Sequence, residues 1–147
     1  GWVFEPKLDG IRAAVHRDAH GARLVTRTGR DVSSGYPELI EALERERPEF
    51  VADGEIVAFD GARTSFAKLQ GRIHVQDPRP ELVAAVPVHL YLFDLLEFDG
   101  HDLTGDRRDE LVAQRIDREA LAHHLLGEHR VGHLLDRHHA YLHDNVL

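Results

Sequence analysis

The sequence predicts an α+β fold in which an antiparallel sheet comes first and helices follow it. Three observations lead to this prediction. Short runs of β-branched, aromatic and apolar residues alternate with turn sequences over the first hundred residues. One stretch in this part, from Pro37 to about Arg47, instead has apolar residues at helical spacing. From Arg107 onward leucines recur at loosely helical intervals without strand signals.

The first elements follow from local pattern and turn composition. Trp2-Val3-Phe4 is β-rich, and Ile11–Arg17 and Arg23–Thr26 flank a turn at residues 18–21, which predicts a β-hairpin. Pro37 opens the predicted helix, whose apolar residues Leu39, Ile40 and Leu43 share one face.

Later elements are predicted in the same way. Phe50–Phe59 has strand character, and Ser65 can cap a short helix that carries Phe66 and Leu69. Residues 77–80 form a Pro-rich loop or linker. Val88–Leu96 is the most apolar segment and is typical of a central strand that ends at an Asp-Gly turn.

Length and composition indicate one globular domain in the cytoplasm. The chain has 147 residues and no cysteine, which excludes disulfides and thiolate metal sites. No apolar stretch reaches membrane-spanning length, and no signal peptide pattern opens the chain. Its net charge is −8, but residues 1–80 hold twelve basic and thirteen acidic residues, whereas residues 81–147 hold six and thirteen. The N-terminal half is therefore the better place for an anionic ligand.

Lys7 is the candidate catalytic residue. It lies on a predicted connection between two strands, near Gly10, and only one other lysine accompanies sixteen arginines. A lysine whose pKa is lowered by its surroundings can act as a nucleophile, whereas an arginine stays protonated. The alternative from these residues alone is a surface hairpin with an exposed ion pair of little energetic value.

Four sequence motifs occur in an order that is hard to explain by chance. They are Glu5-Pro6-Lys7-Leu8-Asp9-Gly10-Ile11-Arg12, Thr26-Arg27-Thr28-Gly29, Val51-Ala52-Asp53-Gly54-Glu55-Ile56-Val57 and Tyr91-Leu92-Phe93-Asp94-Leu95-Leu96. In these motifs the chain resembles the covalent nucleotidyltransferases and, within them, the ATP-dependent DNA ligases. The segment from Ser65 to Arg72 also resembles one that is common in bacterial DNA ligases.

The resemblance implies a role for each matching residue. Lys7 would attack the α-phosphate of ATP and hold AMP, with Mg²⁺ or Mn²⁺ as the metal and nicked double-stranded DNA as the next substrate. The nucleotide would be held by Glu5, Arg12, Arg27, Glu55 and Phe93, whereas no metal ligand is assigned. Asp9 would orient the loop or the lysine. Taken singly, Phe93 also suits an apolar core, and Glu55 and Arg27 also suit a solvated surface.

The resemblance further implies a nucleotidyltransferase (ATP-grasp-like) adenylation domain, with antiparallel sheets and flanking helices, that is incomplete. Residues 1–105 would form its N-terminal part, and residues 106–147 a helical, His-rich tail of uncertain role. The family's later E-G-x-x-x-K and K-x-K motifs are absent, because no Glu-Gly dipeptide occurs and no lysine follows Lys68. We therefore expect this polypeptide alone to be weakly active or inactive, and to lack an oligonucleotide-binding domain or repair partner domains.

Two alternatives stay open at this level. An RNA ligase or GTP-dependent capping enzyme shares the lysine motif, and a non-catalytic nucleotide- or protein-binding remnant would explain the missing motifs. The tail pairs His129 with His133 and His139 with His143 at i,i+4 spacing, which can hold a metal on a helix. No third ligand is evident, so surface histidines are favoured.

Overall fold

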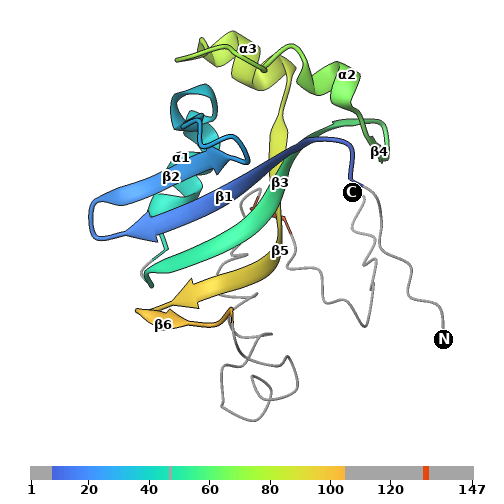
Figure 1. Cartoon of the computed structure of the whole chain (residues 1–147). Helices are drawn as coiled ribbons and strands as arrows, with labels where there is room; N and C mark the ends of the chain where they lie inside the picture. The colour runs from blue at the N-terminus through green and yellow to red at the C-terminus, as the bar shows by residue number, and fades with distance from the viewer. Residues whose placement is uncertain (1–7, 47, 105–130, 133–147) are drawn as a thin grey trace, which may run out of the picture.

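A computed structural model of the chain describes residues 8–46, 48–104 and 131–132. Its main sheet has the strand order β2-β1-β3-β5-β6, with every neighbouring pair antiparallel (Figure 1). The bounds of these strands are β1 Ile11–Asp18, β2 Gly21–Thr26, β3 Phe50–Asp60, β5 Val88–Phe98 and β6 His101–Asp102. The expected α+β class with a mainly antiparallel sheet is confirmed.

β1 and β2 form the predicted hairpin. Asp18 pairs with Gly21, so the connection is the two-residue turn Ala19-His20. The carboxylate of Asp18 accepts a 2.8 Å hydrogen bond from the backbone of His20, and Gly21 has a φ of 129°. Glycine adopts this backbone conformation without steric cost, which explains why the hairpin closes at this position.

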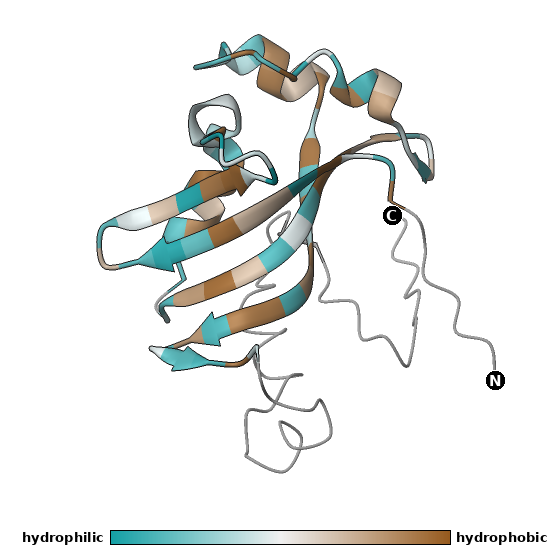
Figure 2. Cartoon of the chain, viewed as in Figure 1, coloured by the Kyte–Doolittle hydropathy of each residue, from teal (hydrophilic) through white to brown (hydrophobic). Residues whose placement is uncertain are grey.

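The core lies between one face of the sheet and helix α1, Pro37–Glu44, which follows a 3₁₀ turn at Ser33–Gly35. Leu39 and Leu43 are one helical turn apart, and both are buried. They pack in one cluster with Val15, Leu24 and other alternate residues of the strands, and Figure 2 shows the hydropathy alternating along the strands. α1 ends at Glu44, earlier than the predicted Arg47, and the proline at position 48 disfavours helix just before it.

A segment from β4 to α3 crosses one end of the sheet (Figure 1). β4 (Arg63–Thr64) pairs with β3, and α2 (Phe66–Leu69) is capped as predicted by Ser65, whose Oγ accepts a hydrogen bond from the backbone amide of Lys68. Leu69 is buried and Lys68 is exposed. α3 (Pro80–Ala85) was not predicted, although a proline at the first helical position followed by Glu81 is a typical start signal.

β5 joins β3 along most of its length, and its turn at Asp99-Gly100 is confirmed by positive φ at both residues. Two residues of the C-terminal tail, Val131–Gly132, form β7, which runs parallel to β5. A strand there was not part of the helical expectation. It extends the sheet at the edge of β5 that β3 leaves open. The rest of the tail, with its paired histidines, lies outside the described residues, as does Trp2-Val3-Phe4.

Candidate active site

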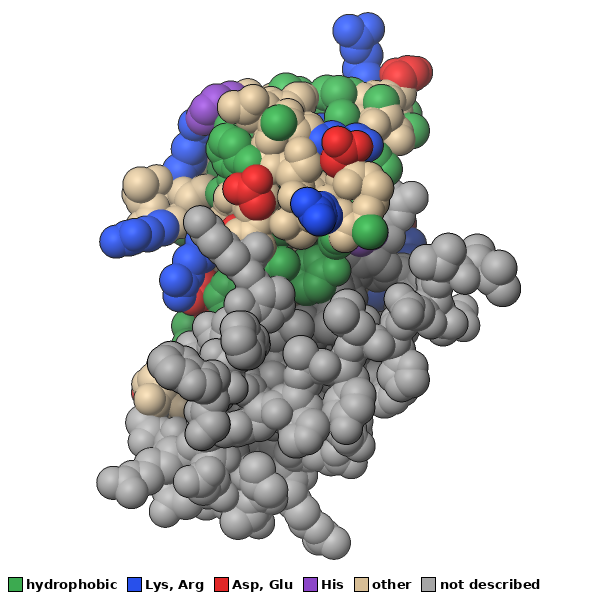
Figure 3. All heavy atoms as spheres, turned by 90° about the vertical axis from the view of Figure 1, so that its right-hand side faces the viewer, with side chains coloured by type: hydrophobic (Ala, Val, Ile, Leu, Met, Phe, Trp, Pro, Cys, Tyr) green, Lys and Arg blue, Asp and Glu red, His purple; other side chains and the backbone are tan. Residues whose placement is uncertain are grey.

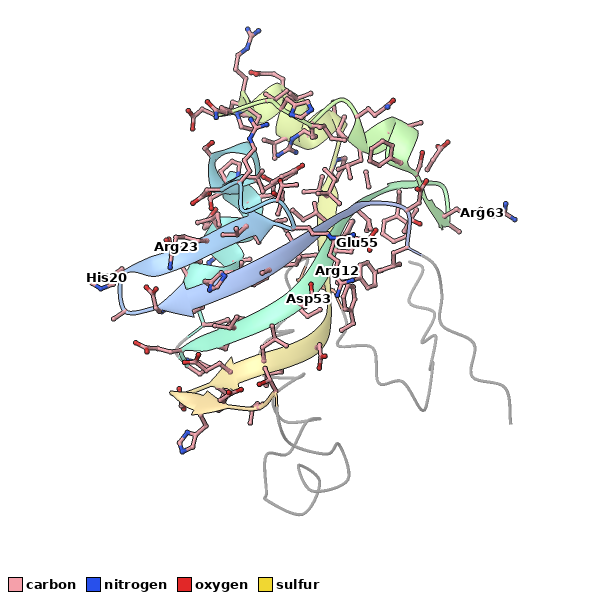
Figure 4. All side chains as sticks on the ribbon, in the orientation of Figure 1. Arg12, His20, Arg23, Asp53, Glu55 and Arg63 are labelled. Atoms are coloured by element: carbon pink, nitrogen blue, oxygen red, sulfur yellow. The ribbon has the colours of Figure 1, made fainter. Side chains whose placement is uncertain are left out.

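The sheet separates a packed face from a polar face. Register places Arg12 of β1 directly across from Glu55 of β3, and Glu55 across from Tyr91 of β5. These side chains alternate with the buried residues that face α1, so they point to the opposite side of the sheet. In Figure 4 Arg12, Asp53 and Glu55 lie together on the strands, whereas His20 and Arg23 lie at the hairpin turn. Predicted site residues from distant parts of the sequence therefore share one surface.

Arg12 is held by two neighbours. Its Nε donates hydrogen bonds of 3.1 and 3.0 Å to the two carboxylate oxygens of Asp53, and its Nη2 also pairs with Asp53. Its guanidinium carbon lies 5.7 Å from the ring centroid of Phe93, within cation–π range. The hydrogen bond to Asp53, supported by its charge, raises the pKa of Arg12. Because the Arg12 side chain is 61% exposed, this arrangement orients the guanidinium without burying it.

Alternation along β5 places Phe93 on the same face as Tyr91, and an irregularity in the pairing follows at this point. Gly54 pairs with Leu92 and Asp53 pairs with Asp94, which leaves Phe93 as an extra residue in a β-bulge. A Cβ on Gly54 would lie 2.4 Å from the carbonyl oxygen of Tyr91, so only glycine permits this close pairing. The ring of Phe93 and the guanidinium of Arg12 thus stand together, as a flat surface beside a cation.

Aromatic side chains continue along the same face. The ring of Phe59 lies 5.2 Å from that of His89, nearly perpendicular to it, and 6.3 Å from that of Tyr91. Burial raises the pKa of the Tyr91 phenol, which is protonated at neutral pH in either case. Among the aromatic residues of this face, the sequence analysis assigned a nucleotide contact only to Phe93.

Glu55 connects the polar face to the loop that follows Lys7. Its Oε1 accepts a 2.9 Å hydrogen bond from the backbone amide of Gly10. Burial raises the pKa of the Glu55 carboxyl, while the Gly10 hydrogen bond and the charge of Arg12 oppose this rise. A carboxylate in this position can accept a hydrogen bond from a ribose hydroxyl with its second oxygen.

Asp9 also anchors this loop, as the sequence suggested in general terms. Its carboxylate accepts a 3.0 Å hydrogen bond from the backbone amide of Phe66, and its own amide donates a 3.1 Å hydrogen bond to the hydroxyl of Thr64. Lys7 and Glu5 lie outside the described residues. In the sequence, Lys7 is two residues before Asp9.

Arg27 follows β2 in an exposed turn. Thr26 is the last residue of β2 and pairs with Ala13, the neighbour of Arg12 in β1. Arg27 follows Thr26 directly, so it lies at the end of the β1–β2 ladder nearest Arg12. Among the described contacts, none joins Arg27 to Arg12, Glu55 or Phe93. The structure therefore brings three of the six predicted residues together, places Arg27 at the adjoining strand end, and leaves Lys7 and Glu5 undescribed.

Two contributors were missed by the sequence reasoning. Asp53 is part of a quoted motif but received no role, although strand alternation puts it on the same face as Glu55 and so within reach of Arg12. Thr64 gave no sequence signal at all, because its contact with Asp9 joins residues that are 55 positions apart.

Arg72 of the ligase-like segment is a structural residue. It is fully buried and donates hydrogen bonds to the backbone carbonyls of Gly35 (2.8 Å) and Val86 (3.0 Å), and it pairs with Glu38 at 2.8 Å. A separate pocket beside it is lined by Ile11, Tyr36 and the loop that carries His74. None of the predicted site residues lines this pocket.

Figure 3 shows acidic and basic side chains interspersed on the described part of the face that it draws, without one continuous charged patch. Within the described ranges, no three His, Asp or Glu residues gather as a metal site. The helices of this part are also too short or too polar to cross a bilayer.

Comparison with known proteins identifies the family. A family model described as "ATP dependent DNA ligase domain" matches residues 1–129. The chain is 42% identical over 104 residues to a probable DNA ligase of Streptomyces avermitilis, covering 69% of this chain and 20% of that protein. It is 38% identical over 127 residues to DNA ligase C1 of Mycolicibacterium smegmatis, covering 82% and 35%.

A solved structure shows the same relationship. The ligase domain of LigD from M. tuberculosis aligns with a TM-score of 0.61 at 36% identity, over 84% of this chain and 37% of that one. A second match, at 35% identity and the same TM-score, is described as mycobacterial DNA ligase D complexed with ATP and MES. The chain belongs to the ATP-dependent DNA ligase domain family, and it spans 20% to 35% of the length of the two curated relatives named above.

Proposed function

We propose that this chain is the N-terminal part of a DNA ligase adenylation domain, in which Lys7 becomes covalently attached to AMP. The observation that carries the proposal is the convergence of Arg12, Glu55 and Phe93 on one face of the sheet, next to the loop that follows Lys7. An aromatic ring, a cation and a hydrogen-bond acceptor suit a purine, a phosphate and a ribose respectively. Family membership and the ATP complex of a solved relative support the choice of nucleotide.

In the proposed reaction, the neutral amine of Lys7 attacks the α-phosphorus of ATP. A nitrogen–phosphorus bond forms, the bond from the α-phosphorus to the bridging oxygen breaks, and pyrophosphate leaves. The amine must lose its proton, so nearby cations such as Arg12 and Arg27 would favour the reactive form. AMP then passes to the 5′-phosphate of a nick, and the adjacent 3′-hydroxyl displaces it.

The nucleotide contacts are assigned by chemistry. Phe93 would stack on adenine, a contact worth about 1–3 kcal/mol in nucleic-acid sites. Glu55 would accept from the ribose, and Arg12 and Arg27 would donate to ribose or phosphate oxygens. Glu5 would also contact the nucleoside.

Mg²⁺, or Mn²⁺, is expected with ATP. The described carboxylates do not form a three-ligand cage, and Asp53 is paired with Arg12. This arrangement fits a cation that arrives on the triphosphate and needs only one or two protein ligands. The metal would neutralise charge on the phosphates during transfer.

Nick sealing would require more than this chain. The chain spans only 20% and 35% of the two curated relatives named above, and Figure 3 shows basic and acidic side chains interspersed on the described part of the face that it draws. We expect the 147-residue polypeptide, taken alone, to take up AMP slowly and not to join nicks. DNA and an oligonucleotide-binding domain would be partners of the longer protein.

The test is incubation of the purified chain with ATP and Mg²⁺, followed by intact-mass spectrometry. A mass gain of one AMP is expected, with no gain from GTP at the same concentration. A GMP adduct would instead favour a capping-type nucleotidyltransferase. A folded protein without any adduct would favour the non-catalytic alternative.

A further inference from the structure

The loop that follows Lys7 is fastened to the β4–α2 segment by two reciprocal hydrogen bonds. The amide of Asp9 donates to Oγ1 of Thr64 at 3.1 Å, and the carboxylate of Asp9 accepts from the amide of Phe66 at 3.0 Å. One residue of the loop therefore uses both its backbone donor and its side-chain acceptor on the same partner segment. This pair of contacts is called the Asp9 clamp below.

The partner segment is itself fixed to the sheet. Thr64 pairs with Phe59 of β3, and the amide of Ser65 donates a 2.8 Å hydrogen bond to the carbonyl of Ala58. Leu69, at the end of α2, is fully buried in the core. The Asp9 clamp thus ties an exposed residue of the loop to β3 and the core.

A third contact holds the loop from the other side. The amide of Gly10 donates to Glu55 at 2.9 Å, and the absence of a side chain at Gly10 lets its backbone approach the carbonyl of Ile56. Two consecutive backbone amides are therefore directed to two different strands. Such a double attachment fixes the direction in which the chain leaves β1 toward Lys7.

We propose that Thr64 is a positioning residue for the nucleophile, acting through Asp9 rather than touching nucleotide. The inference rests on the proposed role of Lys7. The methyl group of Thr64 is not needed for the clamp, whereas its hydroxyl is the acceptor for the Asp9 amide. Loss of that hydroxyl should loosen the loop and leave the polar face of Arg12, Glu55 and Phe93 intact.

The variants are Thr64→Val, which keeps the shape but loses the hydroxyl, and Thr64→Ser, which keeps the hydroxyl. Thr104→Val is the matched control, because the Thr104 hydroxyl also makes a local hydrogen bond, to Asp102, far along the chain from the loop. Each variant is compared with the wild type in two measurements.

The first measurement is hydrogen exchange of the Asp9 amide by NMR, which does not depend on catalysis. Protection at Asp9 should fall about fivefold or more in Thr64→Val, the factor expected for one hydrogen bond, and return in Thr64→Ser. Thr104→Val should match the wild type. Equal protection in Thr64→Val and the wild type would overturn the proposal.

The second measurement is the rate of AMP attachment at varied ATP concentration. Thr64→Val should lower the maximal rate, by up to about a hundredfold, without changing the ATP concentration that gives half of it. A higher ATP concentration at half of the maximal rate, with the maximal rate itself unchanged, would contradict a positioning role. If the wild type takes no AMP, the proposed function fails, and the exchange comparison alone decides whether Thr64 holds the loop.

Discussion

The backbone amide of Gly10 donates a hydrogen bond to Glu55, and this bond joins the loop that follows Lys7 to the middle of the sheet. The two residues are 45 positions apart and belong to two different motifs of the sequence. The close approach of the Gly10 backbone to β3 requires a glycine at this position, and Glu55 beneath it is partly buried. It also makes the loop sensitive to changes on β3.

Substitution of Gly10 by alanine should destabilise the protein. A Cβ at this position would lie 2.2 Å from the carbonyl oxygen of Ile56 and 2.8 Å from a methyl group of Val57, so the backbone must shift. We expect the free energy of unfolding to fall by about 1–3 kcal/mol, as in overpacked cores. Gly71→Ala, where the nearest atoms lie at 3.6 Å, is the control and should change stability little. Identical urea midpoints for the two variants would contradict the close approach at Gly10.

Substitution of Asp53 by asparagine should affect activity more than stability. The Arg12–Asp53 pair is exposed on the Arg12 side, and such pairs contribute at most about 1 kcal/mol. Without the charged carboxylate of Asp53, Arg12 is no longer held over Phe93, so AMP attachment should slow by about tenfold or more. Asp18→Asn breaks a comparable exposed pair with Arg23 at the hairpin turn and should leave the rate unchanged. A normal rate in Asp53→Asn would show that Arg12 needs no such support.

The pH dependence of stability should carry a contribution from Glu55. Burial raises its pKa in the folded protein, so the folded state retains a proton that the unfolded state releases. This contribution is fully present below the ordinary pKa of 4.5 and is lost as the pH rises through the higher folded pKa. Glu55→Gln keeps an acceptor for the Gly10 amide but cannot titrate. Its stability should therefore decline less than that of the wild type as the pH rises from below 4.5 through the raised folded pKa, measured by urea unfolding. Parallel curves would contradict the raised pKa.

Arg72→Leu should be strongly destabilising. The substitution leaves the carbonyls of Gly35 and Val86 and the carboxylate of Glu38 without their partner in a buried place. Breaking a buried pair typically costs about 3–5 kcal/mol, which should appear as a large fall in melting temperature. The control is Arg45→Ala, whose exposed pair with Glu41 is worth about 0.3–0.5 kcal/mol. A small fall in the melting temperature of Arg72→Leu would contradict this expectation and would mean that water takes the place of the guanidinium.

Local signals predicted most of the sheet. The β1–β2 hairpin follows from strand alternation and an Asp-Ala-His-Gly turn, and α1 follows from the helical spacing of Leu39 and Leu43. α3 was missed because six residues with no buried side chain give little periodicity.

Contacts between distant residues could not be predicted in the same way. The contact of Phe93 with Arg12 depends on how β5 and β1 pair with β3, and the burial of Arg72 depends on three separate segments. The ordered motifs nevertheless singled out Arg12, Glu55 and Phe93, and the structure places these three residues on one face of the sheet. The roles of all six residues, including Lys7, Glu5 and Arg27, remain predictions.

The central claim is that Lys7 carries AMP, and the chain offers a sharp test because Lys68 is its only other lysine. Wild type, Lys7→Arg and Lys68→Arg are incubated with ATP and Mg²⁺, and the modified residue is mapped by peptide mass spectrometry. We predict AMP on Lys7 in the wild type and in Lys68→Arg, and none in Lys7→Arg. AMP on Lys68, or an unmodified but folded wild type, would contradict the account.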